Sequence, residues 1–194
     1  REAAPALGAA VTAAMQQLGM DGGRLEVALV AQDTPQAFGL EAVELRVAGH
    51  AGSTPRPLAK VASGGELSRL ALAIAVTTAA KAGATAPPTL IFDEIDAGVG
   101  GSVADQVGRL MKRLGALTQV LAVTHLAQVA ACADHHVVVR KTQHGGRTLS
   151  EVTPVRDEAR VAELARMLGG ERLAADTSRA HAEAMLSGAR GAMT

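Results

Sequence analysis

Aromatic side chains are nearly missing from this 194-residue sequence, which contains two Phe, no Trp and no Tyr. Proteins that bind single-stranded nucleic acid by stacking bases on aromatic rings need several such residues, so this mode of recognition is excluded. Ala, Leu and Val must build the core instead. With 48% hydrophobic residues, the chain has enough apolar material to fold as one or two compact units without disulfides or a structural metal.

Cysteine, net charge and long apolar runs are scarce as well. Cys132 is the only cysteine, which excludes an intrachain disulfide and fits a reducing compartment. The 19 basic residues balance the 19 acidic ones, so composition predicts no general attraction to nucleic acid or to an anionic membrane. No apolar run approaches the roughly 20 residues that span a bilayer, and no secretory signal is recognisable. We therefore expect a cytoplasmic protein whose contacts with DNA, if it has them, are local.

The first sixty residues combine a helical segment with two strands. Residues 1–20 place apolar side chains at alternating steps of four and three, which predicts the end of a coiled-coil helix. The chain begins with this pattern already under way, so we expect a fragment of a longer protein. Residues 21–60 hold two alternating strands, 24–31 and 40–49, followed by a linker over 50–57 that we expect to be irregular.

Residues 61–194 change to short apolar runs that alternate with helical periods. This is the pattern of strands and crossover helices in a mostly parallel sheet, so we predict an α/β fold. The apolar strands lack polar alternation and are expected to be buried on both faces. A Gly-Gly pair at 145–146 predicts a hairpin at one edge of the sheet. The predicted helices span 66–81, 102–114, 157–168 and 177–186, and the predicted strands span 89–92, 118–123, 136–140 and 147–153.

Two adjacent carboxylates follow the apolar strand 89–92. A buried parallel strand presents the residues after it at the carboxyl edge of the sheet, where α/β folds bind nucleotides. Asp93 is suited there to bind Mg²⁺, directly or through water, and Glu94 to orient or deprotonate a water aimed at a γ-phosphate. The alternative is that both side chains only cap the next turn.

A Ser-Gly-Gly-Glu string stands where the Pro/Gly linker meets an apolar helix. Glycines at 64 and 65 let the backbone approach a ligand closely, and the amides at a helix N-terminus attract anions. Ser63 adds a hydroxyl donor. The alternative is an ordinary capping box, in which Ser63 caps the helix and Glu66 occupies its third position. The two interpretations are compatible, because the same amides serve a cap and a phosphate.

His125 follows a third apolar run, residues 120–123, and Thr124. A histidine at the carboxyl edge of a sheet is suited to bind a γ-phosphate or to hold the attacking water, although an ordinary half-buried histidine also fits. Ser63, Asp93 and His125 are separated by 30 and 32 residues. Each interval accommodates one crossover unit, so we expect the three residues to converge at one rim of a single sheet.

These strings resemble, in the same order, the signature, Walker B, D-loop and switch-histidine motifs of ABC-type ATPases. Ala62 and Glu66 stand where transporter ATPases usually have Leu and Gln, which favours the SMC-like branch. More narrowly, nearly all of the chain beyond residue 20 resembles the RecN family of bacterial DNA repair proteins. The segments that carry this resemblance are 57–69, 91–101, 123–130 and 163–170. It implies the C-terminal lobe of an ABC/SMC-type P-loop ATPase head.

The resemblance also implies a composite nucleotide site with ATP and Mg²⁺ as cofactors. In such a site, ATP lies between two heads, held by the phosphate loop of one and covered by the signature of the other. The resemblance implies that Ser63, Gly64, Gly65 and Glu66 contact the ATP of a second head. It implies that Asp93 is a Mg²⁺ ligand and Glu94 the catalytic base. Asp96 would make a contact across the dimer interface, and His125 would sense the γ-phosphate. Arg69, on the signature helix, either transmits the nucleotide state or is ordinary solvated surface.

The sequence departs from a complete ATPase in one respect, since it lacks a phosphate loop. Such a loop needs Gly-Lys-Ser/Thr so that the lysine and the backbone amides hold the β- and γ-phosphates. None of the four lysines, Lys60, Lys81, Lys112 and Lys141, follows a glycine. The resemblance places the missing Walker A motif in an N-terminal lobe, beyond a long coiled coil. We therefore expect this chain alone neither to hold ATP tightly nor to hydrolyse it.

Two functions remain from the sequence. The first is half of an ATPase that dimerises through ATP-sandwiched heads and acts in DNA double-strand break repair and recombination. DNA and a RecA-type recombinase are its implied partners, and the nucleoid is its implied location. The second is a non-hydrolytic, nucleotide-gated DNA clamp or scaffold, in which Asp93 and Glu94 are structural. Two small basic groups, at 109–113 and 156–160, are local candidates for DNA contact and also fit ordinary solvated surface.

Overall fold

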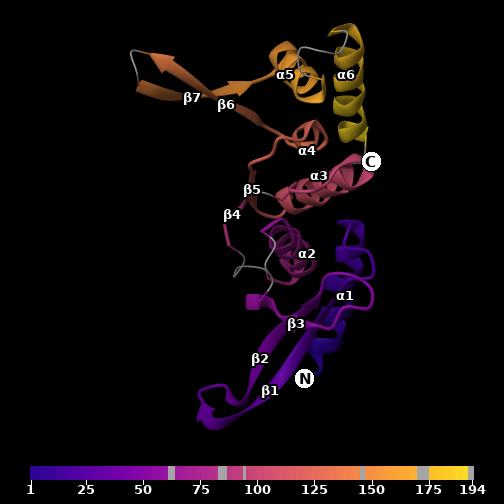
Figure 1. The fold of residues 1–194 in the computed structure, drawn as a ribbon, viewed down its shortest axis with the longest axis vertical. Coiled ribbons are helices and arrows are strands. Elements are labelled where there is room, and N and C mark those ends of the chain that lie inside the picture. Colours follow the sequence, from indigo (N-terminus) through magenta and orange to yellow (C-terminus); the bar gives the residue numbers. More distant parts are fainter. Residues whose placement is uncertain (61–63, 83–86, 94, 145–146, 170–174, 192–194) are drawn as a thin grey trace. The chain divides into compact units, whose positions relative to one another are not determined.

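Two compact units make up the chain, Arg1–Thr124 and His125–Thr194, in the computed structural model (Figure 1). The structure describes residues 1–60, 64–82, 87–93, 95–144, 147–169 and 175–191. Each unit combines helices with strands, in agreement with the predicted α/β class. No helix within the described ranges is long and apolar enough to cross a membrane.

The first unit starts with helix α1 (Ala3–Gln17), as the apolar spacing predicts. Val11 and Leu18, two residues of the apolar seam, are fully buried. The helix packs against β1 (Arg24–Gln36) and α2 (Gly64–Ala82), so these side chains lose contact with water inside the unit. A continuation of α1 into a coiled coil stays a prediction.

Strand β1 pairs with β2 (Gly39–Ala48) in an antiparallel hairpin that is longer than predicted at its turn. A short third strand, β3 (Arg56–Pro57), pairs with β2, and the 3-10 helix η1 (Leu58–Lys60) follows. The expectation that residues 50–57 are irregular is therefore wrong at their C-terminal end. Pro57 is tolerated because β3 lies at the edge of this sheet, where a missing N–H leaves no ladder bond unmade.

A parallel strand pair carries the second half of the first unit. Strand β4 (Thr89–Phe92) pairs with β5 (Gln119–Ala122), and helix α3 (Gly101–Gly115) lies between them in the chain. Helices α2 and α3 and both strands begin and end within two residues of their predicted positions. The helices were predictable because their apolar residues recur with helical period, and Val107 and Leu110 of α3 are indeed buried.

The expectation that these strands are buried on both faces is wrong. Phe92 is buried, but Ile91, which points to the opposite face of β4, is 71% exposed and Leu121 of β5 is 49% exposed. Within the described part of the chain, β4 and β5 form a sheet of two strands only. A continuous apolar run predicts a strand, but it does not reveal which polypeptide covers the second face.

The second unit is built on three helices, α4 (Ala127–Cys132), α5 (Asp157–Gly169) and α6 (Ala175–Gly191). Its core is formed mostly by small side chains: Ala127, Ala130, Ala131, Leu164 and Ala182. Helix α4 is absent from the sequence expectations. Six residues rich in Ala are too few to show an apolar periodicity, so only tertiary packing defines this helix.

An antiparallel hairpin of β6 (His136–His144) and β7 (Arg147–Val155) completes the second unit, as predicted. Its predicted place at one edge of the parallel sheet is not observed, because among the described residues β6 and β7 form a sheet separate from β4 and β5. The predicted turn at 145–146 lies outside the described residues. Val139 is 63% exposed and Val152 is 64% exposed, so the expectation of two buried faces is wrong for β6 as well. Among the described residues, β6 pairs with β7 alone.

Candidate functional site

The carboxyl ends of β4 and β5 lie side by side, because the two strands are parallel, with Phe92 opposite Ala122. The Val123 amide donates to the Phe92 carbonyl at 3.0 Å, which extends the pairing to the point where both loops begin. Asp93 follows β4 directly and is exposed. The residues after the two strands therefore meet at one edge, the place where parallel sheets bind ligands.

The side chain of Asp96 is buried at this edge of the sheet. The residue is 3% exposed, and the Thr124 hydroxyl, which follows β5, donates to Asp96 Oδ2. Its own carbonyl accepts the Val99 amide at 3.1 Å, which closes the turn around Gly98 with its positive φ of 70°. The side chain thus bonds to its own unit in this conformation, and the predicted contact across a dimer interface stays a prediction.

The first turns of α2 contact the loop that follows β4. Ser68 Oγ donates to the Asp93 carbonyl at 2.9 Å, and Arg69 Nη1 donates to the Ala97 carbonyl at 2.9 Å. Gly65 is buried against Ala97, and a Cβ on Gly65 would lie 2.9 Å from the Ala97 carbonyl oxygen. Glycine is needed here for close packing against the loop, whether or not the same position also meets a phosphate.

The Arg69 side chain is partly withdrawn from water. Burial lowers the pKa of this guanidinium, and the nearby Glu66 carboxylate partly offsets the effect. Its Nε atom is buried and makes no hydrogen bond to the residues that the structure describes. Arg69 is therefore not ordinary solvated surface, which was one of the two interpretations that the sequence left open.

Two of the predicted site residues, Ser63 and Glu94, lie outside the described residues, so the capping box and the position of the proposed base stay predictions. Gly64 is the first residue of α2 and is exposed, and Glu66 is half-buried in its first turn. The string therefore does stand at a helix N-terminus. His125 is exposed and is the first residue of the second unit, directly after Thr124.

The described residues are better suited to a metal ion that also binds a ligand than to a metal ion coordinated by protein side chains alone. No group of three or more His, Cys, Asp or Glu able to hold an ion occurs in the part of the chain that was searched. Mg²⁺ is usually bound by one or two carboxylates together with water and substrate phosphates. An exposed Asp93 at a strand end suits that mode, and it would be the residue to hold Mg²⁺.

Sequence reasoning missed two participants at this edge, Thr124 and Ser68. Both act through hydroxyls, and neither stands out in the sequence because Ser and Thr are common at strand ends and on helices. The available signal was position: Thr124 follows an apolar strand just as Asp93 does. The partner of each hydroxyl depends on tertiary packing and was not predictable.

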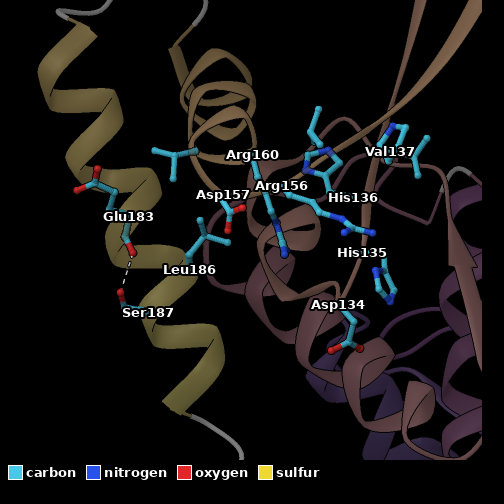
Figure 2. Close-up of a pocket in the computed structure, with 13 residues that line it drawn as sticks. Asp134, His135, His136, Val137, Arg156, Asp157, Arg160, Glu183, Leu186 and Ser187 are labelled. Carbon is cyan, nitrogen blue, oxygen red and sulfur yellow. Dashed lines mark hydrogen bonds between the residues drawn. The ribbon is translucent and has the colours of Figure 1, made fainter.

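The second unit contains a depression with a volume of about 450 Å³ (Figure 2). Basic and acidic side chains alternate around it, including His136, Arg156, Asp157 and Glu183. Arg160 Nη2 lies 2.6–3.2 Å from three carbonyl oxygens at the end of α4, so this cation stabilises a helix terminus. None of the predicted nucleotide-site residues that the structure describes lines this depression. Its mixed charge favours no ligand class.

The chain is similar in sequence to several proteins described as the DNA repair protein RecN. No protein-family model matches the chain. The chain is 45% identical over 201 residues to the DNA repair protein RecN of Streptomyces coelicolor, covering 97% of this chain and 34% of that protein. It is 43% identical over 188 residues to RecN of Deinococcus radiodurans (97% and 32%) and 50% identical over 154 residues to RecN of Mycobacterium tuberculosis (79% and 26%). The chain thus spans between about a quarter and a third of the length of these relatives and matches their C-terminal part.

Two solved structures share the fold. One is an Smc head domain with a coiled coil and joint from Pyrococcus yayanosii, 24% identical with a TM-score of 0.59, covering 82% of this chain and 28% of that one. The other is an Smc head bound to the C-winged helix domain of ScpA, 24% identical with a TM-score of 0.55, covering 81% of this chain and 44% of that one. At this level of identity the likeness concerns the fold alone, and it confirms the α/β architecture expected for a lobe of an SMC-type head.

Proposed function

Since the chain belongs to the RecN family of DNA repair proteins over the C-terminal part that it matches, we propose that it is the C-terminal half of an ATP-hydrolysing head. In this proposal two heads close around ATP and open after hydrolysis, and the cycle acts in DNA double-strand break repair and recombination. DNA and a RecA-type recombinase are the proposed partners, in the cytoplasm near the nucleoid. The complete protein supplies the phosphate loop that this sequence lacks.

The observation that supports this function best is the shared edge of β4 and β5. There the exposed Asp93 follows one strand, Thr124 follows the other, and Asp96 connects the two loops. An edge of this kind gives a metal-bound triphosphate an accessible carboxylate and, beside it, a loop held in a fixed conformation. A structural turn alone would not need a buried carboxylate bonded to the neighbouring strand end.

Each residue has a proposed role at this edge. Asp93 holds Mg²⁺, and Glu94 accepts a proton from the attacking water. The signature residues 63–66 cover the γ-phosphate of ATP that is bound to a second head, and His125 contacts the same phosphate. Bound Mg²⁺ would neutralise charge that develops on the phosphate oxygens. The residues of this chain orient the water and the phosphate.

The substitution Glu94→Gln in the complete protein tests the assignment. It removes the base while keeping size and hydrogen-bonding capacity, so ATP turnover should fall by about 10² to 10⁴. ATP-dependent head dimers, measured by light scattering, should persist, because binding does not need the proton acceptor. Turnover that survives Glu94→Gln would rule out Glu94 as the base, and a wild-type protein without any turnover would favour the non-hydrolytic clamp.

A further inference from the structure

The signature helix α2 holds the loop after β4 by three contacts that involve no carboxylate. Ser68 Oγ and Arg69 Nη1 each bind a backbone carbonyl of that loop at 2.9 Å, those of Asp93 and Ala97. Gly65 packs against Ala97 so closely that a Cβ on Gly65 would lie 2.9 Å from the Ala97 carbonyl oxygen, and one of the two would have to shift. The loop is thus fixed at its first residue and again four residues later.

Both hydrogen bonds from α2 end on backbone carbonyls of the loop and not on its acidic side chains. The Asp93 carbonyl belongs to the peptide bond that leads into Glu94, and Ala97 directly follows Asp96. Because α2 binds these two carbonyls, it restrains the backbone at Asp93 and directly after Asp96. Ile95, between the two anchored carbonyls, is fully buried, which restricts the loop further.

The guanidinium of Arg69 is partly buried where it meets the loop. A guanidinium withdrawn from water loses hydration, and its Nε gains no partner among the residues that the structure describes. A Leu or Met at this helical position would pack without that cost. The long cationic side chain reaches the loop, which a shorter or apolar side chain would not bind.

Resting on the proposed function, we infer that Ser68 and Arg69 are positioning residues that make the start of α2 and the loop 93–98 move as one body. When the signature residues at the start of α2 approach the ATP of a second head, the loop 93–98 of the same head moves with them. The loop positions Asp93 for Mg²⁺ and the neighbouring Glu94 for water. The closing of the two heads and the alignment of the catalytic carboxylates therefore occur together.

The test uses the complete protein with Arg69→Ala, Arg69→Lys and Ser68→Ala. Losing a hydrogen bond from a charged donor that holds the loop in its catalytic position should lower kcat about ten-fold or more, and losing one from a neutral donor about five-fold. We expect kcat to fall by these factors while KM for ATP changes less than about two-fold. Arg69→Lys should recover most of the turnover, because its ammonium still donates to the Ala97 carbonyl.

Two substitutions serve as controls. Arg24→Ala removes an exposed arginine of β1, and Thr78→Ala removes a hydroxyl that bonds only to the Ile74 carbonyl of its own helix. Both should leave kcat unchanged. A comparable loss of kcat in either control would contradict the inference, because the effect would then not be specific to the contacts with the loop.

Hydrogen exchange supplies a second measurement that does not depend on turnover. In Arg69→Ala the amides of residues 95–99, including that of Val99, should exchange about ten-fold faster, while the second half of α2 keeps its protection. A merely structural role would loosen α2 and the loop together. Unchanged exchange in the loop, or unchanged kcat in an active enzyme, would overturn the inference. A wild type without turnover would instead contradict the proposed function, and exchange would still decide the inference.

Discussion

Each unit of this chain contains a partly buried arginine that donates to backbone carbonyls, and the two arginines have different targets. In the first unit, Arg69 makes one bond, to Ala97 in the loop after β4. In the second unit, Arg160 approaches three carbonyls, those of Ala130, Ala131 and Ala133, at the end of helix α4. The first arginine fixes a loop that carries acidic residues, and the second completes a helix terminus.

If the inference about Arg69 holds, the same kind of side chain serves function in one unit and stability in the other. A cation at a helix C-terminus satisfies carbonyls that have no partner within the helix and interacts favourably with the helix dipole. Helix α4 has only six residues, so it depends on such a partner. The loop beyond β4 already has a turn of its own and a bond to Thr124. We therefore infer that Arg69 contributes to the orientation of this loop more than to its stability.

The largest expected effect concerns Arg160. Arg160→Ala leaves the carbonyls at the end of α4 without their cationic donor, so the free energy of unfolding of the second unit should fall by about 2–3 kcal/mol. Hydrogen exchange of the α4 amides in the complete protein measures this loss, and ATP turnover should change little. Arg156→Ala, at an exposed neighbouring position, is the control. If Arg160→Ala abolished turnover while α4 kept its protection, the division between a stabilising and a positioning arginine would be wrong.

A smaller effect is expected at the strand edge of the first unit. Thr124→Val removes the hydroxyl that donates to Asp96 while keeping the shape of the side chain. The buried carboxylate then loses one partner, which should destabilise the loop locally by about 1–2 kcal/mol. Exchange rates of the amides at 95–99 measure this change, and Thr124→Ser should restore the wild-type rates. Identical rates in Thr124→Val and wild type would show that the hydroxyl does not hold the loop.

The smallest expected effect is a dependence of the second unit on pH. Burial, and then the charge of Arg160, lower the pKa of His136 below its usual value of 6.5, and Glu163 offsets this in part. A lowered pKa means that the folded unit favours the neutral imidazole, so the stabilisation is complete above about pH 6.5 and declines as the pH falls below it.

Chemical denaturation at pH 7.5 and pH 5.5 measures this dependence on wild type and His136→Gln. The difference in unfolding free energy between the two pH values should be smaller in His136→Gln, because glutamine takes up no proton in this range. His135→Gln, at the exposed neighbouring histidine, should behave like wild type. An unchanged pH dependence in His136→Gln would show that another group is responsible.

Much of the fold was predictable because local patterns decide it. Helices α2, α3 and α5 follow from apolar residues at helical spacing, and β4 follows from a short apolar run before two carboxylates. The exposure of Ile91 and Val139 was not predictable, because it depends on which polypeptide covers each strand. Helix α4 was missed for a related reason, since its Ala residues acquire a definite role only by packing against Leu164 and Ala182.

In the candidate site, too, local sequence predicts some features and tertiary packing determines the others. Motif order placed Asp93 and Asp96 after β4 and His125 after β5, where the structure has them in the chain. The bonds of Asp96 to Thr124 and of Arg69 to Ala97 join residues 28 positions apart. No spacing rule predicts such bonds, because they form between loops that only the folded sheet brings together.

The central claim is that this chain is one half of a nucleotide site and needs the phosphate loop of the complete protein. Titration calorimetry with ATP and Mg²⁺, on this chain alone and on the complete protein, tests it most directly. We expect no measurable binding to the chain and clear binding to the complete protein, lost again when the lysine of the phosphate loop is replaced. Equally tight binding of ATP to the isolated chain would contradict the claim.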